Sequence, residues 1–476
     1  MTVVALLLAI FMAAMEMTVV STAMPTVVAE LKGALHYAWV FSAYMLTSTV
    51  TVPIHGKLAD LYGRRPVLHV AMVLFLAGSI ACGQASSMSL LIAGRALQGI
   101  GAGGLQPIAL TVIGDIFDLE ERSKMQGIFG AVWGFAGLAG PLLGGLIVAR
   151  WSWRWVFYIN VPFGLLSALV LSFALHETIE KKDHALDIAG AITLSVAVIA
   201  LLVGVEGYQP WLLVPLSIAA TIVFLFVELR AKEPMLPPAL FKRRMLATVS
   251  VLATVAGAAL IGITTFIPLY VQGVLGASPT EAGATIAPMA VGWPVASAIS
   301  GRLIPRLGFR GLVRGGFAIV AASTLAYVFL LSRSPTVSEL RLAGIAFGIG
   351  MGTGMTPMTI AVQTSVSFAE RGVATASTMF FRSIGGTIGV GVMGVVLARD
   401  LLANPVTREA GGSELVAQIL GPERRRVSVD ILDAIAGDLH LGIEHVTWTW
   451  ALFGVVALGA ALAFPATTAV VAPAKR

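Results

Sequence analysis

Three charged side chains lie in the middle of long apolar runs, and they are the residues with which this chain can do chemistry. Among 25 Asp and Glu residues only Glu16 lies mid-run, and among 31 Lys and Arg residues only Arg95 and Arg382 do. A charge at membrane depth is costly and marks a functional candidate. A buried carboxylate can take up and release a proton, and movement of an arginine relative to it can switch its protonation state. The alternative for Glu16 and Arg95 is a static structural ion pair.

The bulk composition places these charges in a membrane protein. Of 476 residues, 57% are hydrophobic and only 12% are charged, whereas soluble domains carry about 25% charged residues. The net charge of +6 does not indicate a nucleic-acid partner, because most Lys and Arg residues lie in short loops between apolar runs. Cys82 is the single cysteine, so no internal disulfide is possible. We therefore expect a lipid bilayer around the chain and no nucleic acid.

The apolar runs are long enough to cross a bilayer as helices, and they predict an all-α protein. The fourteen predicted spans lie at about 2–27, 38–59, 66–85, 89–113, 125–149, 155–176, 188–206, 211–229, 246–272, 281–300, 315–332, 342–365, 373–398 and 445–466. An even number of spans puts both termini on one side. The loops on that side hold most of the Lys and Arg residues, which predicts cytoplasmic termini in the plasma (inner) membrane.

The sequence repeats itself. GKLADLYGRR at 56–65 recurs as GRLIPRLGFR at 301–310, and GRALQGIGAGGLQP at 94–107 recurs as GIAFGIGMGTGMTP at 344–357. The chain therefore divides into a six-helix bundle at 1–176, linkers with two additional helices at 177–244, and a second six-helix bundle at 245–476 with a long extracytoplasmic loop at about 399–443. Parallel halves with a site between them are typical of alternating-access transporters.

Three glycine-rich motifs accompany the charges. GKLADLYGRR places an acid and arginines in a tight loop, LIAGRALQGIGAGG at 91–104 carries Arg95, and GFAGLAGPLLGG at 134–145 allows a bent, closely packed helix. These motifs resemble signatures of the major facilitator superfamily, in particular its fourteen-helix drug:proton antiporter branch. The runs INVP at 159–162 and RGVATASTMFFRSIGGTIGVGVMG at 371–394 resemble that branch as well.

The resemblance implies roles that the residues alone do not establish. It implies a latch on the cytoplasmic side in which Asp60, Arg64 and Asp115 form a breakable charge network. It implies export, because the third motif accompanies export in the superfamily. The alternatives are a solvated basic turn for the latch and a packing interface for the third motif. The implied residues are Glu16 and Arg95 for proton coupling, Gly56, Asp60, Gly63, Arg64, Arg65 and Asp115 for the gate, and Gly140, Pro141, Gly144 and Gly145 for the antiporter motif.

The chain departs from the family pattern at four places. Glu16 stands where the branch normally has an aspartate, and Ser21 replaces the asparagine usual in the same helix. Pro305 stands in the second copy where Asp60 stands in the first. Some exporters of cationic drugs carry extra acids in helix 13, where this chain carries Arg382. Affinity for divalent cations is therefore not implied.

The function implied is export of hydrophobic or amphipathic drugs in exchange for protons, by alternating access and without a cofactor, driven by the proton motive force. The partners are then a small substrate, protons and the bilayer, and we expect a monomer and no metal. The alternatives are an exporter of one metabolite, antibiotic or lipid, or a non-coupled facilitator. An enzyme is disfavoured because the sequence shows no metal-ligand cluster, nucleotide loop or catalytic triad. The residues named for a substrate cavity, with helix packing as the alternative for each, are Trp133, Met351, Met355, Phe380 and Arg382.

Overall fold

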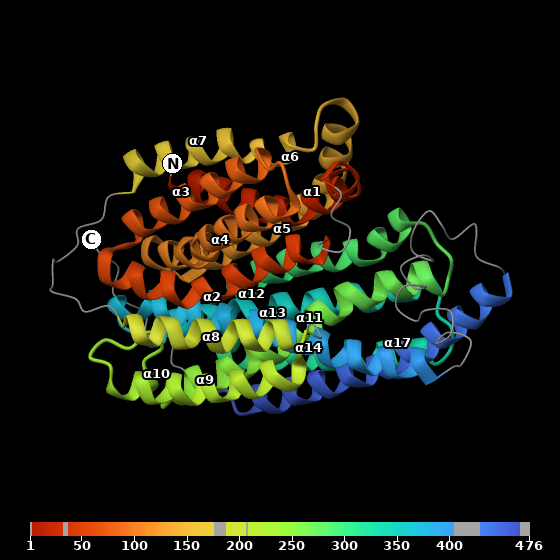
Figure 1. Ribbon diagram of the computed structural model, residues 1–476. Helices are drawn as coiled ribbons and strands as arrows, with labels where there is room; N and C mark the ends of the chain where they lie inside the picture. Colours follow the sequence, from red (N-terminus) through yellow and green to blue (C-terminus); the bar gives the residue numbers. More distant parts are fainter. Residues whose placement is uncertain are drawn as a thin grey trace. The chain divides into compact units, whose positions relative to one another are not determined.

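The regular elements that the structure describes are all helices (Figure 1). The computed structural model describes residues 2–31, 37–117, 119–175, 187–205, 208–403 and 429–466. Almost all of the predicted linker at 177–187 and most of the predicted loop at 399–443 lie outside these residues.

The first copy of the repeat follows the six predicted spans closely. The sixth span is divided into two helices at Ile159, so that Asn160 begins the longer piece. The helices are α1 (Thr2–Leu31), α2 (Tyr37–Tyr62), α3 (Arg64–Gly83), α4 (Met88–Ile116), α5 (Leu119–Arg150), α6 (Trp155–Tyr158) and α7 (Asn160–Ala174).

The remaining spans are helical as well, which confirms the predicted all-α fold with fourteen spans. Two of them lie in α12, which consists of two helical segments that meet at Gly308, a non-helical glycine with positive φ where the loop motif recurs. The elements are α8 (Ile188–Val205), α9 (Pro210–Arg230), α10 (Pro238–Phe241), α11 (Arg244–Gly273), α12 (Pro279–Leu331), α13 (Val337–Ser365), the short 3₁₀ helix η2 (Phe368–Glu370), α14 (Arg371–Ala403) and α17 (Val429–Leu462).

The predicted loop at 399–443 is shorter in the structure than in the prediction. Helix α14 continues to Ala403 and α17 begins at Val429. Ile435, Leu439 and Ile443 recur every four residues in α17, and all three are fully buried. This amphipathic stripe extends the helix beyond its uniformly apolar part, which is why hydropathy alone missed it. By length and composition, eleven helices of the described chain can cross a membrane.

The chain forms two compact units. One contains residues 1–247 together with 359–380, and the other contains 248–358 together with 381–469. In the first unit α4 packs against α2 and α3, α1 packs against α5 and α7, and the additional helices α8 and α9 lie side by side with α8 on α2. In the second unit α12 packs along α17.

Close packing of α2 on α4 depends on small residues. An added Cβ at Gly99 would collide with the Thr47 hydroxyl, and one at Gly103 would collide with the Thr51 hydroxyl. The threonines use this proximity, since Thr47 donates to the carbonyl of Ala96 at 2.9 Å. Small residues that let backbones approach are the usual means of helix association in membranes.

Candidate functional site

The two predicted proton-coupling residues form a buried ion pair in the first unit. Nη1 of Arg95 on α4 lies 2.6 Å from Oε1 of Glu16 on α1. Each residue is only 1% exposed. The structure therefore brings together the one mid-span acid and one of the two mid-span bases named from the sequence, and it does so within a single bundle.

Three further polar side chains complete a ring around this pair. Nδ2 of Asn160 on α7 donates to Oε2 of Glu16 at 2.5 Å. Nη1 of Arg95 also donates to Oε1 of Gln98 at 2.7 Å, and Nε2 of Gln98 donates to Oγ of Ser79 on α3 at 2.8 Å. Ser79 lies 3.5 Å from Nδ2 of Asn160, which closes the ring. The ring joins α1, α3, α4 and α7, and all its members are at most 1% exposed.

Arg95 is held from a second direction by α2. Its Nε donates to the carbonyl of Val40 at 3.0 Å, and its Cζ lies 4.2 Å from the centre of the Tyr44 ring. A buried guanidinium without such partners would be strongly unfavourable. Hydrogen bonds and a cation–π contact therefore fix the orientation in which Arg95 faces Glu16.

The antiporter motif packs directly beside Glu16. A Cβ at Gly140 of α5 would collide with the hydroxyl of Thr18, and one at Gly144 would collide with that of Thr22, so both glycines face α1. Thr18 donates to the carbonyl of Ala136 on α5 at 3.1 Å. Gly145 faces open space, and Pro141 lies in the same unbroken helix. Movement of α5 against α1 would therefore act on the turn that follows Glu16.

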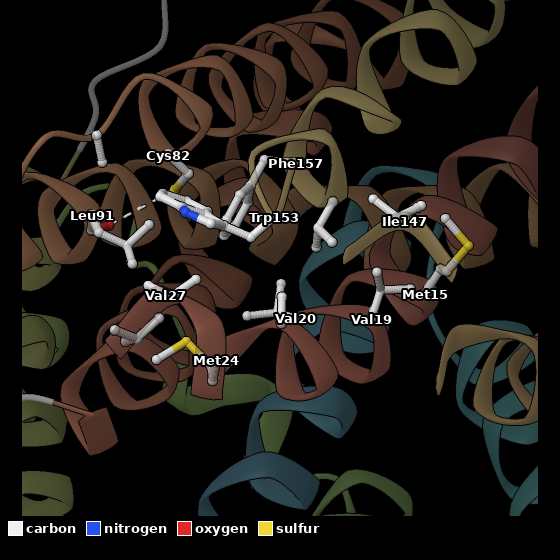
Figure 2. Close-up of a cluster of buried hydrophobic side chains, with 14 of the residues drawn as sticks. Met15, Val19, Val20, Met24, Val27, Cys82, Leu91, Ile147, Trp153 and Phe157 are labelled. Atoms are coloured by element: carbon white, nitrogen blue, oxygen red, sulfur yellow. Dashed lines mark hydrogen bonds between the residues drawn. The ribbon is translucent and has the colours of Figure 1, made fainter. Parts of the chain in front are cut away.

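An apolar cluster in the first unit joins residues of α1, α3 and α4 to the segment that follows α5 (Figure 2). Trp153 and Phe157 pack here against α1 residues such as Val20 and Met24 and against Leu91 of α4. Trp153 is anchored to the end of α1, where its Nε1 donates to Glu30 at 2.7 Å. The cluster includes Met15, the neighbour of Glu16 in α1, and Leu91, one helical turn before Arg95 in α4.

The predicted gate residues form a second charged network at the opposite end of α2 and α4. Arg64 begins α3 and pairs with Asp60 (Nη2 to Oδ1, 3.1 Å) and with Asp115 (Nε to Oδ2, 3.1 Å). Gly63 precedes it with φ of 95°, a conformation that favours glycine. The structure thus brings together the three residues that the resemblance named as a latch.

The latch also holds the start of α14, which belongs to the same unit. The carboxylate of Asp60 accepts the backbone N–H groups of Gly372 at 2.9 Å and Val373 at 2.7 Å. Arg371 pairs with Asp115 at 2.9 Å, and Gly56 faces Ala376 so closely that a Cβ would collide with it. A side chain on Gly56 would therefore keep α14 from seating against α2.

Arg65, also named for the gate, donates to the carbonyl of Ser172 on α7 at 2.7 Å. Sequence reasoning missed Arg371 and the two backbone donors that follow it. The recurrence of Glu121-Arg122 as Glu370-Arg371 was the available signal for them. It likewise missed Asn160 as a partner of Glu16, although the INVP run contains it.

The residues named for a substrate cavity are mostly packed inside protein. Met351 and Met355 on α13 and Phe380 on α14 are buried. Trp133 is half-buried against the apolar cluster, and its buried Nε1 has no hydrogen-bond partner among the described residues. Arg382 is half-buried, and its backbone lies against Gly257 of α11. Their role in substrate binding stays a prediction.

A polytopic helical protein with two repeated bundles and a buried ion pair has the architecture of a membrane transporter. The model of the Major Facilitator Superfamily matches residues 6–390, and the chain belongs to that superfamily. It is 39% identical to the multidrug transporter protein MdtP of Bacillus subtilis over 82% of this chain and 74% of that protein. It is 38% identical to multidrug resistance protein 3 of the same organism over 82% of this chain and 78% of that protein.

Solved structures agree on the fold. The human organic anion transporter MFSD10 matches with a TM-score of 0.67, covering 97% of this chain and 98% of that one, at 14% sequence identity. Such a distant likeness concerns the fold alone. Together, the family and the fold identify the protein as a transporter of the superfamily and confirm the family named from the sequence motifs.

Proposed function

We propose that the protein is a proton-coupled antiporter that exports hydrophobic or amphipathic drugs by alternating access, driven by the proton motive force and without a cofactor. The observation that carries this proposal is the buried Glu16–Arg95 pair. A carboxylate held by a single arginine in an apolar bundle has two accessible charge states, which proton exchange requires. The multidrug transporters among the relatives support the substrate class.

The cycle follows from the two charged networks. In the inward-facing state Glu16 loses its proton to the cytoplasm, either on its own or because the arriving substrate displaces it. In the outward-facing state it is reprotonated as the substrate leaves. Arg95 stabilises the carboxylate between these events, so the pair weakens each time Glu16 is protonated. The latch of Asp60, Arg64 and Asp115 closes the cytoplasmic side while the other side is open.

The proposed setting is the plasma (inner) membrane with both termini in the cytoplasm, and the working unit is a monomer. The basic loops of the sequence support this orientation. The partners are then the substrate, protons and lipid. The latch lies at the cytoplasmic surface in this orientation, and the apolar cluster around Trp153 faces the outside.

Proteoliposomes with a trapped pH-sensitive dye test the proposal. A pH gradient is first set across the membrane, and a lipophilic cation such as ethidium is then added as substrate. In wild-type proteoliposomes, transport of ethidium should move protons in the opposite direction, which the trapped dye reports. Glu16→Gln should abolish this proton movement while leaving the protein folded. Glu228→Gln is the matched control, because Glu228 is also buried, at 2% exposed, but its carboxylate accepts the backbone N–H groups of Met235 and Leu236. Full proton-coupled transport by Glu16→Gln would refute the mechanism.

The breadth of substrates separates the drug exporter from an exporter of one metabolite, antibiotic or lipid. In a growth-inhibition screen of chemically diverse compounds, a drug exporter protects against several unrelated classes and Glu16→Gln loses all of them together. Protection against one compound alone would favour the alternative.

A further inference from the structure

The carboxylate of Glu16 has a second partner besides Arg95, the side-chain amide of Asn160. The ion pair alone does not explain why this amide is there. Arg95 binds Oε1, whereas Asn160 binds Oε2 through Nδ2. The two donors come from different helices, α4 and α7. An ionised carboxylate has acceptor sites on both oxygens, so this arrangement fits the charged form of Glu16.

The other end of the Asn160 amide is unsatisfied. Its Oδ1 is buried and has no hydrogen-bond partner in the described chain, although Asn160 is only 1% exposed. An unpaired buried carbonyl is costly, and such exceptions need a reason. The ring therefore contains one acceptor more than the charged form of Glu16 uses.

A protonated Glu16 needs a hydrogen-bond acceptor, and Oδ1 of Asn160 is one that the described residues leave unused. The protonated acid carries one O–H donor, and an arginine has no acceptor to offer it. Oε1 of Gln98 already accepts from Arg95. Rotation of the Asn160 amide about its terminal bond would bring Oδ1 to the place now occupied by Nδ2. The same side chain can then donate to the carboxylate and accept from the acid.

We propose that Asn160 is a positioning residue that reads the protonation state of Glu16, by donating Nδ2 to the carboxylate and presenting Oδ1 to the protonated acid. The inference rests on the proposed proton coupling and extends it to α7. Protonation then weakens the tie to Arg95 and keeps the tie to Asn160, so that α1 stays bound to α7 while α4 is released. Asn160 does not react with the proton itself.

The backbone around Asn160 is built to hold it in place. Asn160 is the first residue of α7, after the short helix α6. The segment before it is fastened to α1, because both Trp153 and Arg154 donate to Glu30 at 2.7 Å. Helix α1 therefore carries both the acid and the anchor of the segment that presents the amide.

Charged and titratable groups reach the pair from three neighbouring helices. On α4 the group is Arg95 itself. On α2 it is Tyr44, which stacks on the Arg95 guanidinium, and on α3 it is Cys82, whose Sγ donates to the carbonyl of Leu91 at 3.8 Å. Helix α7, which presents Asn160, carries no titratable side chain between Asn160 and Ala174.

Infrared titration of the detergent-solubilised full chain tests the inference without relying on transport. The carboxylic C=O band that disappears in Glu16→Gln reports the protonated acid. In Asn160→Leu, which preserves volume, that band should move to higher frequency and its titration midpoint should rise by about one pH unit, because the charged form loses the stronger bond. Asn160→Asp should raise the midpoint further, since two adjacent carboxylates share one proton.

Ser167→Ala is the control. Ser167 lies on the same helix, is fully buried, and donates to the carbonyl of Ala5 on α1 at 2.7 Å. Its loss weakens the same helix pair without touching Glu16, so the band and its midpoint should stay as in the wild type. An unchanged band in both Asn160 variants, or an equal shift in Ser167→Ala, overturns the inference.

The pH profile of substrate-driven proton release in proteoliposomes separates this inference from the proposed function. A parallel upward shift of that profile in Asn160→Leu supports both. If Glu16→Gln abolishes transport but Asn160→Leu has the profile and band of the wild type, only the role of Asn160 fails. If the band shifts as expected but Glu16→Gln transports like the wild type, the proposed function fails. Asn160 would then still respond to the protonation of Glu16, but Glu16 would have no part in transport.

Discussion

In each copy of the repeat a glycine lets two helices pack closely, but the residues around that contact differ. They are charged and polar in the first copy and apolar in the second. In the first copy Gly140 of α5 faces Thr18 of α1. In the second copy Gly385 of α14 packs against the backbone of Thr254 of α11. Two positions before Thr18 stands Glu16, whereas two positions before Thr254 stands Leu252, which is fully buried. The packing surface is thus shared and the acid is not.

The partners of Glu16 are replaced as well. Gly94 recurs as Gly344, so the counterpart of Arg95 is Ile345. Gly164 packs on Leu76 and Gly454 packs on Ala321 at the corresponding position of α12. The residue four positions before each glycine is Asn160 in the first copy and Trp450 in the second, where Trp450 packs edge-to-face on Tyr327.

This contrast separates what the fold needs from what has been added to it. The second copy forms its bundle with aliphatic and aromatic side chains where the first copy has a buried ring of charges and amides. A buried ion pair is often no more stabilising than well-packed apolar groups of similar volume. The polar ring of the first copy is therefore not explained by stability, whereas the proton exchange proposed above would give it a role.

The strongest test of this comparison places the apolar residues of the second copy at the positions of Glu16 and Arg95 in the first. Arg95→Ile alone should destabilise the protein by about 3–5 kcal/mol, because it leaves Glu16 buried without its partner. The double variant Glu16→Leu with Arg95→Ile should recover most of that loss while proton-coupled transport stays absent. Chemical unfolding in detergent and proton release from proteoliposomes measure the two quantities. A double variant as unstable as the single one would mean that the pair is structural.

Glycine-to-alanine substitutions test how closely the helices pack at this contact in each copy. Gly385→Ala should cost about 1–3 kcal/mol, because the obstacle is the backbone of Thr254, which cannot yield without shifting α11. Gly140→Ala should cost less, because the nearest obstacle is a side-chain hydroxyl. Gly145→Ala, which meets open space, is the control and should stay within about 0.5 kcal/mol of the wild type. Thermal unfolding in detergent gives the ranking, and the reverse order of the first two would contradict the shared geometry.

The loop motif offers a second contrast, since Asp60 in the first copy is replaced by Pro305 in the second. Asp60→Asn keeps the shape of the side chain but loses a charged acceptor for two backbone N–H groups of α14. Hydrogen bonds to charged groups contribute about 1.5–3 kcal/mol, so the closed latch should lose at least about tenfold in population.

Faster hydrogen exchange at residues 371–376 and a slower transport rate would report the loss of the Asp60 latch. Arg65→Gln removes an arginine of the same motif that donates to α7, and it should leave exchange in that segment unchanged. Equal effects of both variants would assign the change to general loosening of the loop.

Fourteen spans could be predicted from the sequence because each apolar run is long enough to cross a bilayer as a helix. Hydropathy does not record where a helix continues as an amphipathic stripe, so the start of α17 at Val429 was missed. The two predicted spans of α12 remain separate helical segments that meet at the non-helical residue Gly308.

The ion pair was within reach of the sequence because Glu16 and Arg95 are both mid-span and a buried charge needs a partner. Asn160 was not, because an uncharged amide at the start of a helix has no cost that forces a partner to be sought. The same holds for the backbone donors at Gly372 and Val373, which carry no side-chain signature. Contacts made by neutral or backbone groups depend on tertiary placement, and only the structure supplies that.

The smallest expected effect comes from an ion pair that resembles the first one in chemistry and differs in exposure. Glu30 and Arg154 pair at 2.7 Å, but their side chains are 48% and 31% exposed. The hydrogen bond from Arg154, followed by that from Trp153, holds the pKa of Glu30 below its usual value. A lowered pKa means that this carboxylate stabilises the fold at neutral pH and loses that contribution as the pH falls through the folded-state value.

Glu30→Gln should therefore melt only slightly below the wild type at pH 7, since exposed pairs are screened by water and salt. The difference should shrink as the pH falls through the lowered folded-state pKa of Glu30, where Glu30 of the wild type becomes neutral too. Melting curves of both proteins across this range, with 1 M salt as a second condition, make the measurement. Arg95→Ile should show a deficit that salt does not change, because water and ions do not reach the buried pair. A salt-insensitive deficit in Glu30→Gln would instead mean that the hydrogen bond to Trp153, rather than the charge, fastens α1 to the segment that presents Asn160.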